Sequence, residues 1–167
     1  MKKYIIAVIV LTGFLLNVSL SAAQAQPRAL VKITGMITKP LSFTVSDLNK
    51  FKQTRVSYKS KDGKSHIYSG VLLAELLQKA GAAMGKALRG GNLNKYVQIS
   101  ASDNYKVVFA LAELDNEFTD RLIILATSVD GKSLPAKEGP FRVIVEGEKK
   151  PARCIRMVTV IKVESAK

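Results

Sequence analysis

Three arginines near the end of the chain are the side chains best suited to bind a small anion. They are Arg142, Arg153 and Arg156. A guanidinium group presents paired N–H donors that match two oxygens of a phosphate, sulfate or carboxylate group. The same arginines could instead lie on strands and pair with acidic neighbours in the sequence (Glu146, Glu148 or Glu164). The sequence leaves both interpretations open.

The chain contains one histidine, His66, and one cysteine, Cys154. His66 lies in a polar segment beside Tyr68, where it could bind a ligand, transfer a proton or be an ordinary exposed residue. Cys154 lies beside apolar residues, which predicts a buried thiol that behaves as a small hydrophobic side chain. A zinc site needs several Cys and His ligands at close spacing, and a disulfide needs two cysteines. We therefore predict no metal site, no intramolecular disulfide and no catalytic residue.

Short strands dominate the elements that must position these side chains. Alternating apolar residues predict strands at about 30–37, 96–100, 105–111 and 122–129, and two last strands at 141–145 and 154–163. Residues 54–68 alternate on both sides of Asp62-Gly63, a dipeptide typical of hairpin turns, and predict a two-stranded ribbon.

Helices are few in the predicted fold. The main helix is predicted from Val71 to Gly81, because its leucines share one face and Gly81 stands where a left-handed C-cap is needed. Thr44 and Asp47 have the spacing of a capping box, which predicts a short helix. Residues 82–94 are rich in small side chains and predict a loop. The predicted class is α+β, with mixed or antiparallel sheets.

The first 25 residues have the pattern of a secretory signal peptide. Lys2 and Lys3 precede an uncharged apolar run, and Ala23-Gln24-Ala25 forms a small-x-small cleavage site. We predict cleavage after Ala25 and a periplasmic or secreted protein. The alternative is an uncleaved anchor, but the apolar run is shorter than the roughly 18 residues that a membrane span requires.

Cleavage would leave residues 26–167 as a single domain. The chain has a net charge of +13, and the two lysines of the leader account for +2 of it. A basic exported domain would attract an anionic small molecule or an exported protein partner. The basic residues are scattered and lack interleaved aromatic residues, which argues against nucleic-acid binding. No second long apolar stretch follows, so we predict a soluble protein with no membrane span after the leader is removed.

Several segments of the mature chain are informative when they are taken together. They are Gly70-Val71-x-Leu73 before a helix ending Ala80-Gly81, Ala101-x-Asp103-x-Tyr105, Glu113-Leu114-Asp115, Asp130-Gly131-x-x-Leu134, Gly139-Pro140-Phe141-Arg142 and Pro151-Ala152-Arg153-Cys154-Ile155-Arg156-Met157-Val158. In their order and spacing they resemble the oxidoreductase molybdopterin-binding domain family, the fold of sulfite oxidase and its periplasmic relatives. The resemblance covers about residues 30–163, which is essentially the whole mature chain.

The resemblance implies a sulfite-oxidase-like α+β fold and a candidate site. In this family a Cys thiolate, located before the Gly-Val-x-Leu helix, ligates a pterin-bound molybdenum. Residues 52–69, the corresponding stretch here, contain no Cys. The family also implies a site for the pterin or another anion, to which we assign Arg142, Arg153, Arg156, His66 and Tyr105. Tyr105 belongs to the turn Asp103-Asn104-Tyr105, for which a structural role is the stronger interpretation.

These observations lead to two functional hypotheses. The favoured one is a non-catalytic binding or accessory module without a cofactor, which recognises an anionic ligand or a redox or signalling partner. The alternative is a molybdopterin-dependent oxidoreductase with an unusual ligand set. In this family the cofactor is inserted in the cytoplasm, and its export requires a twin-arginine signal. The leader has Lys2-Lys3 and no arginine pair, which agrees with the favoured hypothesis.

Overall fold

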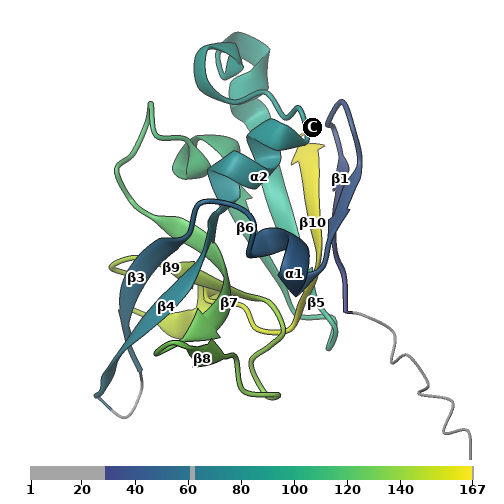
Figure 1. The fold of residues 1–167 in the computed structure, drawn as a ribbon. Helices are drawn as coiled ribbons and strands as arrows, with labels where there is room; N and C mark the ends of the chain where they lie inside the picture. Colours follow the sequence, from purple (N-terminus) through teal and green to yellow (C-terminus); the bar gives the residue numbers. More distant parts are fainter. Residues whose placement is uncertain (1–28, 61–62, 167) are drawn as a thin grey trace, which may run out of the picture.

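The computed structural model describes residues 29–60 and 63–166, which form two five-stranded sheets (Figure 1). Sheet A has the strand order β2-β1-β10-β5-β6. Its strands β1 and β10 run parallel and the other neighbours run antiparallel. Its strands are β1 (Val31–Gly35), β2 (Leu41–Phe43), β5 (Lys95–Ala101), β6 (Lys106–Ala110) and β10 (Val158–Ser165). Alternate residues of β5 and β6 are buried, as the period-2 pattern of the sequence predicts.

Sheet B is antiparallel throughout and has the order β3-β4-β7-β8, with β9 also paired to β7. Its strands are β3 (Thr54–Lys59), β4 (Ser65–Leu72), β7 (Ile123–Val129), β8 (Lys132–Ser133) and β9 (Arg142–Val145). Every residue of β9 and the first five residues of β7 are buried. These two strands therefore lie in the interior of the domain, and the β3–β4 hairpin projects from it (Figure 1).

Two α-helices accompany the sheets. Helix α1 (Val45–Leu48) begins with the predicted capping box, in which Thr44 and Asp47 bond reciprocally. Helix α2 (Leu73–Lys79) begins two residues later than predicted, because β4 extends to Leu72. Gly70 permits this extension, since a Cβ at this position would overlap the backbone carbonyl of Leu125 on β7. Gly81 follows α2 with a φ of 78°, as the predicted C-cap requires.

Four 3-10 helices connect the regular elements. Two of them, η1 (Gly85–Ala87) and η2 (Gly90–Asn94), lie in the predicted loop, and the others are η3 (Leu111–Leu114) and η4 (Pro151–Arg153). Asp115, in the Glu-Leu-Asp segment, is buried, and its carboxylate accepts hydrogen bonds from the backbone N–H groups of Gly85 and Glu117. The Asp115 carboxylate therefore attaches the 82–94 loop to the rest of the domain.

The prediction of a last strand from Cys154 was wrong, because β10 begins only at Val158. The preceding segment starts with η4, and its backbone turns at Met157, which has a φ of 49°. Its N–H and C=O groups bond to other parts of the fold: Val143 N–H donates to the Ile155 carbonyl over 2.8 Å, and Met157 N–H donates to the Glu138 carbonyl over 3.0 Å. Segment 151–157 therefore crosses beside β9 as an irregular wall.

The structure confirms the α+β class with mixed and antiparallel sheets. None of the helices among residues 29–60 and 63–166 is long and apolar enough to cross a bilayer. The predicted signal peptide and its cleavage site lie outside the described residues.

Candidate functional site

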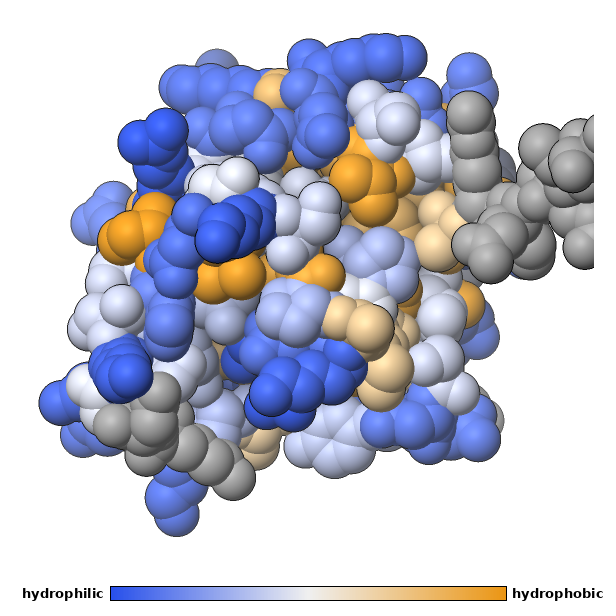
Figure 2. Space-filling model, turned by 60° about the horizontal axis from the view of Figure 1, so that its bottom comes forward, coloured by the Kyte–Doolittle hydropathy of each residue, from blue (hydrophilic) through white to orange (hydrophobic). Residues whose placement is uncertain are grey.

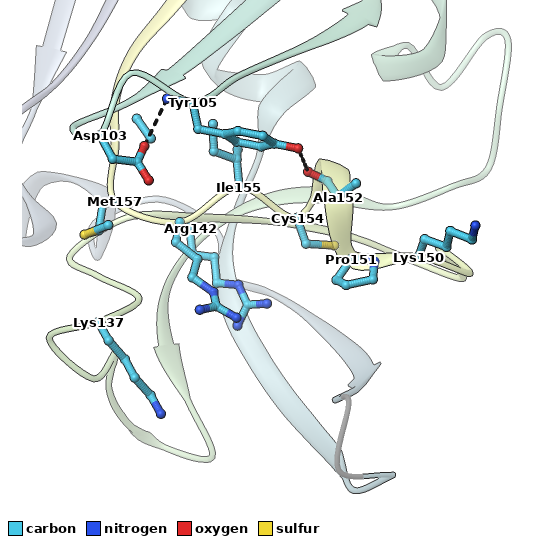
Figure 3. A pocket seen from close by; sticks show the side chains of 12 residues that line it. Asp103, Tyr105, Lys137, Arg142, Lys150, Pro151, Ala152, Cys154, Ile155 and Met157 are labelled. Carbon is cyan, nitrogen blue, oxygen red and sulfur yellow. Dashed lines mark hydrogen bonds between the residues drawn. The ribbon is translucent and has the colours of Figure 1, made fainter.

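A cavity of about 530 Å³ opens between segment 151–157, the β5–β6 turn and the start of β9 (Figure 3). Arg142, Arg156, Lys137 and Lys150 line it, and Asp103 is its one acidic lining residue. The other lining groups are largely apolar. Figure 2, which views the bottom of the molecule, shows hydrophobic patches surrounded by hydrophilic side chains on this side. A cavity of this size and composition suits a small anionic ligand with an apolar part.

Arg142 is the buried cation of the cavity, with 3% of its side chain exposed. Its Nη1 donates to the Glu138 carboxylate over 2.6 Å and to the Tyr68 hydroxyl over 2.6 Å. The Tyr68 hydroxyl in turn donates to Glu138 over 3.1 Å. The guanidinium carbon lies 5.3 Å from the ring centre of Tyr58 and 5.0 Å from that of Tyr68. The β3–β4 hairpin thus supplies two aromatic rings that fix the arginine from one side.

The opposite edge of the Arg142 guanidinium has no partner. Its Nε is buried without a hydrogen bond, and its Nη2 makes none with any described residue. Nε–H and Nη2–H point the same way and form the side-on pair that binds an oxyanion through two parallel hydrogen bonds. Arg142 also lines the cavity, so its guanidinium group lies at the candidate site.

The pKa values of Glu138 and Tyr68 determine the charge of the group that they form with Arg142. Burial by itself raises the pKa of Glu138, but the hydrogen bond and charge of Arg142 outweigh it and hold that pKa below its ordinary value. Burial raises the pKa of Tyr68 to about 12. At neutral pH the ion pair of Arg142 and Glu138 is thus neutral overall. The net positive charge of the cavity comes from Arg156, Lys137 and Lys150, for which the described part of the chain offers no hydrogen-bond or ion-pair partner.

Two of the predicted site residues, Arg153 and His66, lie outside the cavity lining. Arg153 does not line the cavity: its Nη1 lies 2.7 Å from Glu113 and its Nη2 lies 2.7 Å from Glu148. Glu148 is one of the partners that the alternative interpretation offered. His66 lies on β4, and its Nδ1 is 2.6 Å from the Asp130 carboxylate. His66 is also absent from the cavity lining.

Tyr105 does line the cavity, beside Arg142 and Arg156. Its side chain is 48% exposed, and its hydroxyl donates to the Ala152 carbonyl over 3.0 Å. The carboxylate of Asp103 accepts from the Tyr105 N–H, and Asn104 between them has a φ of 68°. This left-handed Asn closes the predicted turn and leaves the phenol ring at the cavity mouth (Figure 3).

Sequence reasoning missed five contributors to this region. Tyr58, Tyr68 and Glu138 surround Arg142, and two lysines, Lys137 and Lys150, line the cavity. The predicted hairpin carried a usable signal, because alternate residues of a ribbon share one face and Tyr58 and Tyr68 both lie on the buried one. The spacing of Glu138 and Arg142 gave no such signal, since Gly139-Pro140 intervenes.

Comparison with known proteins decides the family. The sequence model of the oxidoreductase molybdopterin binding domain matches residues 21–167. The chain belongs to this family. Among solved structures, the sulfane dehydrogenase SoxCD from Paracoccus pantotrophus is similar, with a TM-score of 0.62 and 19% sequence identity. The match covers 83% of this chain but only 38% of that one. A search of curated proteins found no match.

The donor atoms near Arg142 test whether this molybdopterin-family domain can hold the metal. The family's metal requires a soft thiolate from the protein. The only thiol, Cys154, is 3% exposed, and burial raises its pKa, so it stays protonated at neutral pH. The hairpin that replaces the Cys-bearing stretch offers Tyr58 and Tyr68, and burial raises the pKa of both phenols. Within the described ranges, no three His, Cys, Asp or Glu residues are grouped to hold a metal ion.

The molybdopterin family's cofactor therefore fits this site only in part. The cations of the cavity suit the phosphate of a pterin or any other oxyanion. The donor set does not suit the molybdenum, because no group near the cavity is an ionised thiolate at neutral pH. The residues present can bind and orient an anion, and they offer no ligand for the metal step of the family.

Proposed function

We propose that this domain is a non-catalytic binding module of the molybdopterin-binding fold, which takes a small anionic ligand in the cavity instead of a molybdenum centre. One observation carries the proposal. Where the fold needs a thiolate, the hairpin supplies Tyr58 and Tyr68, and the lone thiol of Cys154 is buried in protonated form. The unpartnered edge of Arg142 and the free charge of Arg156 support an anion as the ligand.

Metal and pterin content test this proposal directly. The protein, purified from the compartment to which it is exported, should contain no stoichiometric molybdenum by mass spectrometry and should release no fluorescent pterin on oxidation. Stoichiometric molybdenum would instead favour the alternative, a molybdopterin-dependent oxidoreductase with an unusual ligand set.

Anion binding is tested by the thermal stabilisation that added phosphate or sulfate produces. A ligand that binds only the folded state raises the Tm in proportion to the logarithm of its concentration. The double variant Arg142→Ala/Arg156→Ala should lose this stabilisation. Because the loss of Arg142 also disturbs packing, Arg156→Gln/Lys150→Gln serves as a milder variant. Arg55→Gln/Lys59→Gln is the matched control, since both residues are exposed on β3 and absent from the cavity lining. Stabilisation that persists in all variants would reject the cavity as the anion site.

The proposal includes export of the protein from the cytoplasm. The leader predicts a periplasmic or secreted protein, and an exported protein partner is the second class of ligand that a basic domain would attract. Cell fractionation and N-terminal sequencing should give a mature chain that begins at Gln26. A chain that keeps its leader in the membrane fraction would show that the leader acts as an anchor.

A further inference from the structure

The cavity wall, segment 151–157, has two different attachments. Its second half is held by backbone hydrogen bonds to the β9 region, where the Ile155 carbonyl accepts from Val143 and Met157 N–H donates to Glu138. Its first half does not pair with a strand of either sheet. Side-chain contacts hold it instead, and their partners lie in or beside β6 and η3 and in the turn that follows β9.

Two side-chain tethers hold this first half. The Tyr105 hydroxyl donates to the Ala152 carbonyl over 3.0 Å. Arg153 bonds to Glu113 of η3 and to Glu148, each over 2.7 Å, and its guanidinium carbon lies 4.9 Å from the ring centre of Phe109 on β6. Tyr105, Glu113 and Phe109 thus join the wall to β6 and the segments that flank it, and Glu148 joins it to the turn after β9.

The tethered stretch lies between two cations of the cavity. Lys150 precedes η4 and Arg156 follows Cys154, and both line the cavity, whereas Arg153 does not. The position of the wall therefore sets how far apart these two charges stand. Met157, with a φ of 49°, keeps the end of the wall in a backbone conformation that a side-chain-bearing residue seldom adopts. Such a segment keeps its shape only when its surroundings fix it.

We propose that Tyr105 and Arg153 are positioning residues, which hold the wall closed over Cys154 and keep Lys150 and Arg156 at the spacing that the anion requires. This proposal rests on the proposed function for its ligand, but the closed wall is a separate claim. A preorganised site avoids the cost of ordering its charges when the ligand binds, so loosening the wall should weaken anion binding.

Cys154 provides a readout that does not depend on any ligand. Its thiol is 3% exposed, and it is the one cysteine of the whole chain, so a thiol reagent such as DTNB reports exposure of this single position. Arg153→Met keeps an apolar stem against Phe109 but removes both ion pairs. We expect this variant to label about fivefold faster, the factor that corresponds to about 1 kcal/mol. Tyr105→Phe removes only one hydroxyl and should label about threefold faster.

Matched controls separate wall opening from general loss of stability. Tyr96→Phe removes a hydroxyl that bonds to Glu164 on sheet A, and Arg121→Met removes an exposed arginine that does not line the cavity. Both should label at the wild-type rate. Urea unfolding of each variant gives the contribution of global unfolding to the labelling rate, and this contribution is subtracted.

Phosphate binding, measured by calorimetry, completes the experiment. Arg153→Met should weaken the Kd for phosphate about tenfold and Tyr105→Phe about threefold. Unchanged labelling in both variants overturns the proposal. Faster labelling with an unchanged Kd also overturns it, because the wall would then not set the charge spacing. If wild-type protein fails to bind phosphate or sulfate, the proposed function fails, and the labelling rates alone decide whether the tethers hold the wall.

Discussion

Arg142 and Arg153 have similar chemical surroundings but differ in the number of carboxylates that they contact and in their exposure. Each contacts a carboxylate and an aromatic ring, but Arg153 has one carboxylate for each of its two terminal nitrogens, and Arg142 has one carboxylate for the whole group. Arg153 is 30% exposed, and each of its terminal nitrogens donates to a carboxylate. Arg142 is nearly fully buried and keeps the Nε–Nη2 edge free. The two arginines therefore differ in the number of their acidic partners and not in the type of residue.

The largest expected effect on stability comes from the loss of Arg142, the buried cation. Arg142→Met should destabilise the domain by about 3 kcal/mol, because Glu138 is left as a partly buried charge without its partner. Urea unfolding at pH 7 measures this loss. The double variant Arg142→Met/Glu138→Gln should recover part of the stability, and a double variant no more stable than the single one would contradict the charge-pair explanation.

Glu138 should give the next largest effect, with a distinct pH dependence. Glu138→Gln should cost about 2 kcal/mol at pH 7, because it weakens a charge-assisted hydrogen bond. The pKa of Glu138 in the folded state lies below its ordinary value of 4.5, so its contribution to stability is present above pH 4.5 and is lost as the pH falls through the folded pKa. The difference between wild type and variant should therefore shrink in acid. A difference that stays constant from pH 7 to pH 3 would exclude this role.

The phenol of Tyr68 links the two charged partners and should matter less. Tyr68→Phe removes a hydroxyl that donates to Glu138 and accepts from Arg142, and should cost about 1 kcal/mol. Its pKa of about 12 implies that the hydroxyl's contribution is complete below pH 10 and is lost as the pH rises through the folded value. Because burial raises the pKa of both Tyr58 and Tyr68, ultraviolet titration should show fewer tyrosines ionising near pH 10 in wild type than in the unfolded chain. An equal count would place Tyr68 in water.

Arg153 should show a loss of stability as small as that of Tyr68. Its ion pairs are partly exposed, so Arg153→Met should cost about 1 kcal/mol in urea unfolding. Raising the salt concentration should reduce this cost, because exposed charges are screened. A cost that equals that of Arg142→Met would remove the contrast between the two arginines.

Most of the fold follows from local patterns in the sequence. The capping box at Thr44, the glycine after α2 and the alternating strands each depend on residues a few positions apart, and the structure contains them. The start of the last strand could not be found this way. Cys154 and Ile155 are apolar, a pattern that predicts a strand. The turn at Met157 instead depends on contacts with residues far away in the sequence.

The candidate site was only partly predictable for the same reason. Arg142, Arg156 and Tyr105 come together at the cavity as the family resemblance implies. Nothing local distinguishes Arg153 from them, because its partners include Glu113, forty residues earlier in the chain. The tyrosines that fix Arg142 lie more than seventy residues before it and meet it only when sheet B has formed.

The parallel pairing of β1 and β10 has a consequence for how the domain is made. The first strand of the domain lies next to its last one, and that last strand separates β1 from β5 at the centre of sheet A. A ribosome must therefore release almost the entire chain before sheet A can close, and long-range pairings of this kind form slowly. An unfinished chain lacks the strand that joins β1 to β5, so sheet A cannot be complete while such a chain is threaded through the export route that the leader predicts.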